Sequence, residues 1–221
     1  MNRSKYMIIK VCGTREAENI HALTELGVDW IGFDFRPDSP KFVRQISSRA
    51  GIIPDYGSRE AAMGKETVQN ESADGCFPQC FGVFVDDMPQ NIVTRVVNFK
   101  LTMVQLDGEE SSVMVNNLRS TLDPDIRAGV NIMKTLQIQS VEDLMQTREY
   151  EGSVDYFLFK VDTAKVDLNV IKTYAGSTPF IIGNVALEQL DKLKPFQHPM
   201  FVGVDLDDCA DVQTAVKALT E

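Results

Sequence analysis

Short runs of apolar residues alternate along the chain with longer stretches in which apolar residues recur at helical spacing. The apolar runs are continuous rather than alternating, which is typical of parallel strands covered on both faces. We expect strands at residues 8–12, 30–35, 81–85, 103–106, 130–136, 156–159, 180–183 and 201–206. We expect helices at residues 16–26, 89–99, 111–122, 141–149, 168–174, 186–193 and 211–219.

Strands that alternate with helices in this way predict a single α/β domain over residues 1–221, folded as a (β/α)8 TIM barrel. A doubly wound open sheet gives a similar alternation, so the pattern alone leaves closure of the barrel open. Residues 51–75 have little periodic apolar pattern and many Gly, Ser, Asn, Glu and Asp residues. We expect them to form a flexible insertion after the second strand, with a partner-binding lid as the alternative.

Charge and hydropathy exclude several classes of partner. The chain of 221 residues has 32 acidic and 22 basic residues, a formal net charge of −10, which argues against binding to nucleic acid or to anionic membranes. No run approaches the roughly 20 apolar residues that span a bilayer. The start of the chain has neither the apolar core nor the cleavage site of a secretion signal. We therefore expect a cytoplasmic protein.

The four cysteines, Cys12, Cys76, Cys80 and Cys209, are scattered along the sequence. Cys76 and Cys80 form a C-x3-C pair, but no second pair follows and the two histidines lie far away in sequence. A structural zinc site needs four Cys or His ligands in two close pairs. We expect reduced thiols, no metal and no cofactor.

Several motifs follow one another across most of the chain. KVCG at 10–13 precedes Arg15, and later motifs are EN at 18–19, GVDWIGF at 27–33, PDSPKFV at 37–43, GVFV at 82–85 and VQLDGEE at 104–110. In this combination the chain resembles phosphoribosylanthranilate isomerase, the family that carries out the Amadori rearrangement of tryptophan biosynthesis. The resemblance implies a (β/α)8 barrel, a small phosphorylated amino-sugar as substrate, and a monomer or a homodimer.

The family's reaction opens an aminofuranose, which requires an acid at the ring oxygen and a base that removes the proton at C2. The resemblance places the base at Cys12, at the carboxyl end of the first strand. It places the acid at the end of the sixth strand, in a run like L-x-D-T. Aligned without a gap, Lys160 occupies the position of the acid. Shifted by two residues, Asp162 restores the carboxylate on the same face of the strand.

The resemblance also implies substrate-binding positions around the barrel mouth, namely Arg15, Lys41, Asp107, Lys160, Gly183, Asn184 and Asp205. Lys41 replaces the family's arginine, Asp107 its histidine, and Asn184 the second glycine of a Gly-Gly pair. Asp107 and Lys160 are both expected at strand ends, which suggests the hypothesis that they form an ion pair. The glycine loop after the sixth strand is missing, and an acidic turn at 205–211 replaces a turn of small residues.

Phosphate binds at helix N-termini through free backbone N–H groups. A carboxylate there competes for those donors and repels a phosphate by about 4 kcal/mol at 4 Å for an effective dielectric constant near 20. The sequence thus predicts a weakened phosphate site, and three functions stay open. They are an isomerase of phosphoribosylanthranilate, a non-catalytic paralogue that acts as a binding or regulatory scaffold, and a barrel adapted to a less anionic ligand.

Overall fold

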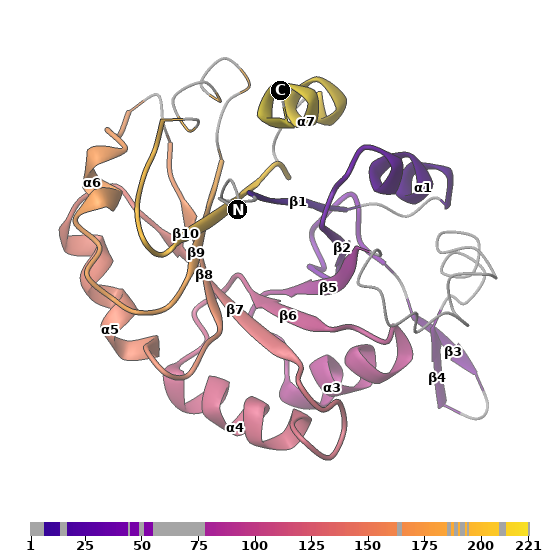
Figure 1. Cartoon of the computed structure of the whole chain (residues 1–221). Coiled ribbons are helices and arrows are strands. Elements are labelled where there is room, and N and C mark those ends of the chain that lie inside the picture. The colour runs from indigo at the N-terminus through magenta and orange to yellow at the C-terminus, as the bar shows by residue number, and fades with distance from the viewer. Residues whose placement is uncertain are drawn as a thin grey trace.

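Eight parallel strands close into a barrel in the computed structural model (Figure 1). The structure describes residues 7–13, 17–43, 45–48, 51–54, 78–162, 165–184, 187, 190, 193, 195–207 and 211–220. Around the ring the strands are β1 (Ile8–Cys12), β2 (Trp30–Asp34), β5 (Gln79–Phe84), β6 (Met103–Leu106), β7 (Asn131–Gln137), β8 (Tyr156–Lys160), β9 (Phe180–Gly183) and β10 (Phe201–Asp205). Because β1 pairs with both β2 and β10, the sheet has no free edge. The prediction of a TIM barrel is therefore confirmed, and the alternative of a doubly wound open sheet is excluded.

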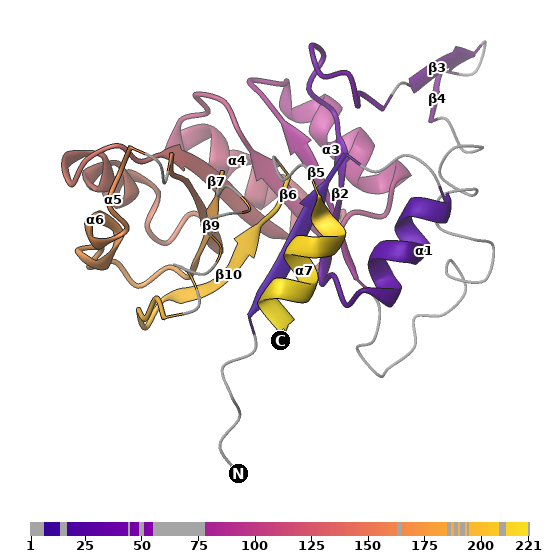
Figure 2. The same ribbon diagram turned by 90° about the horizontal axis from the view of Figure 1, so that it is seen from above.

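The helices lie outside the strands and follow them along the chain (Figures 1 and 2). They are α1 (Ala17–Glu25), α3 (Pro89–Asn98), α4 (Ser112–Leu122), the 3-10 helix η1 (Glu142–Gln146), α5 (Thr147–Tyr150), α6 (Asn169–Lys172) and α7 (Val212–Thr220). The side chain of Ser111 accepts a hydrogen bond from the N–H of Met114 and caps α4. Among the described residues, no helix has the length and apolar character needed to cross a membrane.

The segment expected as one helix at 141–149 is instead divided into η1 and α5. The carboxylate of Asp143 accepts the N–H groups of Gln139 and Ser140, both at 2.9 Å. These bonds tie the two residues before the N-cap of η1 to its first turn. The helix expected at 186–193 falls largely outside the described residues.

A small hairpin lies beside the barrel and was not expected. Strands β3 (Gln45–Ser48) and β4 (Gly51–Pro54) pair in antiparallel fashion away from the barrel sheet (Figures 1 and 2). β4 occupies the first residues of the segment 51–75, and residues 55–75 lie outside the described part of the chain. The flexible insertion at 51–75 therefore stays a prediction.

The barrel interior is filled by large apolar side chains, one from most strands. They are Cys12, Trp30, Phe81, Val83, Met103, Met133, Leu158 and Ile181. A Cβ on Gly32 would lie 2.2 Å from the ring of Phe81, so the ring can cross the barrel only because Gly32 has no side chain. A second and larger apolar cluster joins the outer faces of the strands to the helices. Beyond this packed interior, polar side chains lie at one end of the barrel.

Candidate active site

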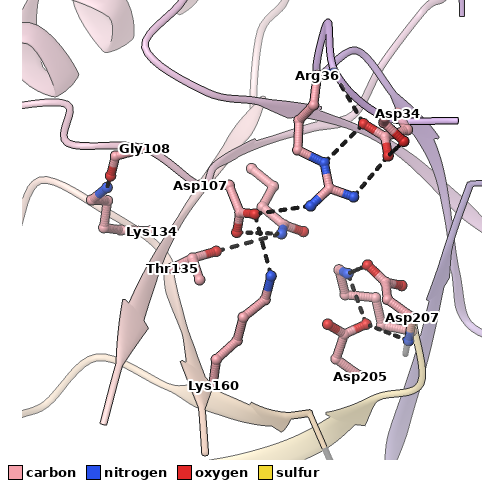
Figure 3. A network of polar contacts seen from close by, with 12 residues as sticks. Asp34, Arg36, Asp107, Gly108, Lys134, Thr135, Lys160, Asp205 and Asp207 are labelled. Carbon is pink, nitrogen blue, oxygen red and sulfur yellow. Dashed lines mark hydrogen bonds and ion pairs between the residues drawn. The ribbon is translucent and has the colours of Figure 1, made fainter. Parts of the chain in front are cut away.

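Charged side chains gather at the carboxyl ends of the strands, the end of a TIM barrel where catalytic residues lie (Figure 3). We call this end the mouth. Cys12 ends β1, Asp34 ends β2, Lys160 ends β8 and Asp205 ends β10. Asp107 follows β6 directly. The structure therefore brings together four of the sequence-predicted site residues: Cys12, Asp107, Lys160 and Asp205.

Cys12 is buried at the end of β1 and packs in the interior cluster. Burial raises the pKa of its thiol well above the usual range, and the negative charge of Asp207 raises it further. The ammonium group of Lys10 opposes both effects. At neutral pH the resting side chain is therefore a thiol rather than a thiolate.

Lys10 lies two residues before Cys12, on the same face of β1, and its side chain is fully buried. Its Nζ is 2.9 Å from Oδ1 of Asp205 and 3.1 Å from Oδ2 of Asp207, and it lies 4.4 Å from the centre of the Phe81 ring. Burial alone would lower the pKa of Lys10, but the two carboxylates raise it above its usual value. Burial and the charge of Asp207 raise the pKa of Asp205. The buried ammonium group of Lys10 is thus the shared ion-pair partner of the Asp205 and Asp207 carboxyl groups.

Arg36 folds back over the end of β2 and binds Asp34 through two hydrogen bonds (Figure 3). Nε lies 2.9 Å from Oδ1 and Nη2 lies 2.7 Å from Oδ2. The hydroxyl of Ser39 also donates to Asp34, at 2.6 Å. Burial would raise the pKa of Asp34, but the hydrogen bonds from Arg36 and Ser39 hold it below its usual value. The pair is therefore ionised at neutral pH.

The carboxylate of Asp107 contacts side chains from several elements around the mouth. Its Oδ2 lies 3.2 Å from Nη1 of Arg36 and 3.2 Å from Nζ of Lys160, and Gln105 donates to its Oδ1 at 3.3 Å. Burial would raise the pKa of Asp107, but the charge of Lys160, a hydrogen bond from Thr135 and the charge of Arg36 lower it. The hypothesis of an Asp107–Lys160 ion pair is confirmed. We call the chain of contacts from Asp34 through Arg36 and Asp107 to Lys160 the mouth network.

A buried ion pair holds the loop that carries Asp107. Lys134 on β7 donates to the carbonyl oxygen of Gly108 and lies 2.9 Å from Oε2 of Glu110. Glu110 in turn accepts the backbone N–H of Asp86 at 2.9 Å and that of Gly108 at 3.1 Å. These contacts of Glu110 and Lys134 hold the loop that carries Asp107 in place.

Lys160 and Asp162, the two candidates for the acid position, have different surroundings. Lys160 lies in β8 opposite Gly183 and reaches the mouth network. The carboxylate of Asp162 lies 2.7 Å from Nζ of the exposed Lys165. The group that faces the barrel mouth through the mouth network is therefore the ammonium of Lys160.

The remaining sequence-predicted positions lie around the same rim. A Cβ on Gly13 would lie 2.2 Å from Cδ and 3.1 Å from Nζ of Lys41, so the lysine side chain crosses the end of β1 beside Cys12. Asn184 follows β9 and has φ of 59°, the left-handed conformation that glycine adopts most readily and asparagine tolerates. The turn after β9 therefore has a backbone conformation that glycine also adopts. Arg15 lies outside the described residues.

Sequence reasoning missed Lys10, Asp34, Arg36 and Asp207 as members of the site. The signal for Lys10 was its spacing of two from Cys12, because such residues share a strand face. The signal for Asp34 was a charged residue next to the last position of the otherwise apolar strand predicted at 30–35. Together the mouth holds the cations of Lys10, Arg36, Lys41 and Lys160 and the carboxyl groups of Asp34, Asp107, Asp205 and Asp207. Within the described ranges, no three His, Cys, Asp or Glu side chains are grouped so that they could hold a metal ion.

Solved structures share this fold. Phosphoribosylanthranilate isomerase from Thermotoga maritima superposes with a TM-score of 0.72 at 19% identity, over 97% of both chains. A phosphoribosylanthranilate isomerase in complex with reduced 1-(o-carboxyphenylamino)-1-deoxyribulose 5-phosphate gives 0.71 at 16% identity, over 97% of this chain and 98% of the other. At these identities the likeness concerns the fold alone.

Sequence comparison reaches further than the structural likeness. No protein-family model matches the chain. The N-(5'-phosphoribosyl)anthranilate isomerase of Parabacteroides distasonis is 31% identical over 219 residues, which cover 96% of this chain and 88% of that protein. The protein of the same name from Phocaeicola vulgatus is 33% identical over 221 residues, which cover 96% and 92%. With such identity over nearly its whole length, the chain belongs to the N-(5'-phosphoribosyl)anthranilate isomerase family.

Proposed function

We propose that the protein is an isomerase that carries out the Amadori rearrangement of an N-ribosylated anthranilate. N-(5'-phosphoribosyl)anthranilate, which gives its relatives their name, is the first substrate to test. The observation that carries the proposal is the position of Cys12. It ends β1 inside the mouth, within the KVCG motif, where the family resemblance places the base.

Cys12 removes the C2 proton of the opened sugar. The base must be a thiolate, and burial together with Asp207 disfavours that form in the resting protein. Opening of the protonated ring leaves a positive charge on the imine, next to the carbon that loses its proton. A positive charge close to a thiol lowers its pKa, as Lys10 already does from the side of the protein. Ring opening therefore favours the thiolate, with the thiol proton released to solvent, and the thiolate then takes the C2 proton.

Lys160 protonates the ring oxygen as the sugar opens. Its ammonium faces the mouth and is held by Asp107, whereas Asp162 is paired with Lys165. Asp107 does not take this role, because the charges of Lys160 and Arg36 keep it ionised. An ammonium is a weaker acid than a carboxylic acid. We therefore expect slow turnover, limited by ring opening.

The test is conversion of N-(5'-phosphoribosyl)anthranilate by the purified full chain, with the product separated by chromatography. We expect measurable conversion by the wild type and a loss of at least about 100-fold in Cys12→Ala, the size of a missing general base. Cys80→Ala is the matched control, because Cys80 lies near the amino end of β5, at the end of the barrel opposite the mouth. Circular dichroism checks that each variant is folded.

The acid is assigned by two further variants. Lys160→Met should lower the rate, whereas Asp162→Asn should leave it close to that of the wild type. The reverse result would assign the acid to Asp162 and overturn the role of Lys160. A folded wild-type protein without conversion, or a Cys12→Ala variant as active as the wild type, would contradict the proposed function and favour a non-catalytic scaffold.

A further inference from the structure

Exposed apolar side chains gather at one sector of the barrel's outer rim, beside the mouth. In the part of the chain that the structure describes, six large apolar side chains are exposed, and four of these lie at or near the N-termini of α3, α4 and η1. They are Met88, Val113, Val141 and Met145, between 47% and 67% exposed. Each of these helices follows a strand that ends at the mouth, so all four residues lie at that end of the barrel. Single exposed apolar residues are ordinary on a protein surface, whereas a group of them marks an interaction site.

The same sector of the rim is acidic. Four exposed carboxylates lie before α3, before α4, in η1 and in α5, namely Asp86, Glu109, Glu142 and Glu149. Within the described segments 85–94, 107–118 and 137–149, Arg148 is the one exposed Lys or Arg. We call these four acids and the four apolar residues above the acidic rim. The helices that carry them, α3, α4 and α5, follow one another around the barrel (Figure 1).

Hydrogen bonds hold the acidic rim as one surface. The backbone N–H of Glu109 donates to Oδ1 of Asp86 at 2.7 Å, which joins the segments before α4 and before α3. The hydroxyl of Tyr150 donates to the carbonyl oxygen of Glu110 at 2.8 Å, which joins α5 to the segment before α4. A partner therefore meets a preformed surface, and the entropic cost of ordering it does not weaken binding.

The charge of the acidic rim decides what kind of partner fits it. A second copy of this chain would bring further carboxylates to the rim, and the formal net charge of −10 opposes such a contact. A partner that adds a strand is excluded at this surface, since the barrel sheet is closed. A helix with one apolar face, bordered by Lys or Arg, matches both the apolar and the acidic side chains.

The size of the acidic rim also suits a helix. Neighbouring packed helices lie about 8–10 Å apart, so the rim from α3 across α4 to η1 spans roughly 20 Å. A helix of about 14 residues has this length, at about 1.5 Å per residue. The two methionines add to the fit, because their flexible side chains adapt to the shape of an apolar partner.

We infer that the acidic rim is a docking surface for a basic amphipathic helix of another protein. The apolar face of that helix covers Met88, Val113 and Met145. Its Lys or Arg side chains pair with the carboxylates between them. The inference goes beyond the proposed function and is independent of it, because the mouth network takes no part in the contact.

The test measures binding of a synthetic peptide to the full chain by titration calorimetry. The probe has about 14 residues, all Leu or Lys, with the leucines at helical spacing. One control peptide has the same composition without that spacing, and another has Glu in place of Lys. We expect the probe to bind at least about tenfold more tightly than either control, and less tightly as the salt concentration rises. A probe that does not bind, or that binds no better than the controls, overturns the inference.

Variants locate the binding on the acidic rim. Val113→Ser/Met145→Ser removes apolar contacts, and Glu109→Gln/Glu142→Gln removes negative charge. Each double variant should weaken binding of the probe about tenfold or more. All four side chains are exposed, so we expect both variants to fold, which circular dichroism checks. Unchanged affinity in both folded variants contradicts the inference.

The matched control variants change the same residue types far from the acidic rim. They are Val97→Ser/Ile126→Ser and Glu25→Gln/Asp125→Asn, all at exposed residues near or beyond the C-terminal ends of α1, α3 and α4. We expect them to bind the probe within about twofold of the wild type. A loss as large as that of the rim variants would mean that the peptide recognises overall charge and hydrophobicity, and it would overturn the inference.

Sedimentation velocity tests a second copy as the occupant. The measurement compares the wild type with Val113→Ser/Met145→Ser over a range of protein concentrations. We expect the same oligomeric state in both proteins. A dimer that forms in the wild type and is lost in the variant would show that the acidic rim joins two copies, and the inference of a basic helix would be wrong.

Discussion

Oδ2 of Asp107 lies at the same distance, 3.2 Å, from Nζ of Lys160 and from Nη1 of Arg36. One oxygen therefore links the segment after β6 to β8 and to the end of β2. The family resemblance implies a histidine at the position of Asp107 and, in the alignment without a gap, an acid at that of Lys160. In this chain the two positions carry a carboxylate after β6 and an ammonium on β8, and the two groups pair across the mouth.

The energetic value of this contact can be measured with a double-mutant cycle of Lys160→Met and Asp107→Asn. We expect a coupling free energy of about 0.5–3 kcal/mol, the range for partners in one polar network. Urea unfolding of the wild type, the single variants and the double variant gives the value. Lys165→Met with Asp162→Asn is the control cycle, and we expect no measurable coupling there, because that pair is exposed. Coupling equally absent from the first cycle would contradict a structural role of the mouth network.

Arg36 should make the protein sensitive to acid. The pKa values of Asp34 and Asp107 are lowered in the folded state, partly by Arg36. Groups of this kind stabilise the fold above their unfolded pKa, near 3.9, and lose that contribution as the pH falls through the folded value. We expect the free energy of unfolding to fall below about pH 4 in the wild type and less steeply in Arg36→Met. Urea unfolding over a pH series checks this, with the exposed Arg148→Met as control.

The sequence predicts those parts of the site that depend on strand direction. Parallel strands end on one rim, so residues at the ends of predicted strands meet there, as Cys12, Asp107, Lys160 and Asp205 do. The prediction of a single helix at 141–149 was wrong, because the segment is divided into η1 and α5. Side-chain hydrogen bonds of Asp143 there compete with the regular helical pattern, which periodicity does not register.

The contacts of Lys10 and Arg36 illustrate what periodicity leaves out. Lys10 lies in a run of Ile and Val, and its partner Asp205 is 195 residues away. The alternation of side chains along a strand predicts which face of β1 carries Lys10. It does not predict which distant carboxylate pairs with its ammonium group. Arg36 binds Asp34 only because the chain folds back after β2 ends. Such a turn depends on local backbone geometry rather than on the strand pattern.

Lys10→Met should destabilise the protein at neutral pH by about 3–5 kcal/mol, as expected when a buried ion pair loses one partner. The carboxyl groups of Asp205 and Asp207 would then lie together without a cation. Burial and mutual repulsion already raise the pKa of Asp205, and loss of Lys10 raises it further. An acid with a raised folded pKa stabilises below its unfolded pKa and loses that contribution as the pH rises.

The expected result is therefore a variant whose deficit grows from about pH 4 upward. The double variant Lys10→Met/Asp207→Asn tests the cause, because it removes one of the two carboxylates and should recover part of the stability. Urea unfolding at several pH values gives both results. A deficit in Lys10→Met that does not change with pH would show that lost packing against Phe81, rather than charge, is responsible.

Cys12 should react slowly with iodoacetamide in the wild type and faster in Asp207→Asn. The negative charge of Asp207 raises the pKa of the thiol, so its removal increases the thiolate fraction. Each unit of pKa changes that fraction up to about tenfold. Peptide mapping by mass spectrometry gives the rate at Cys12, with Cys80 in the same sample as the reference. Equal rates in the two proteins would mean that access, not ionisation, limits the thiol.

Asn184 tests whether the turn after β9 still requires a glycine-like backbone. Its φ of 59° is unfavourable for residues with a Cβ by about 1–2 kcal/mol, and asparagine is among the few that adopt it readily. We expect Asn184→Ala to lower the free energy of unfolding by about 1 kcal/mol and Asn184→Gly to leave it nearly unchanged. Gly152→Ala is a suitable reference, because Gly152 has φ of 80° and open space around it, so only the backbone term changes. An Asn184→Ala variant with an unchanged free energy of unfolding would mean that this turn relaxes out of the left-handed conformation. In that case residue 184 does not fix the backbone geometry beside Gly183.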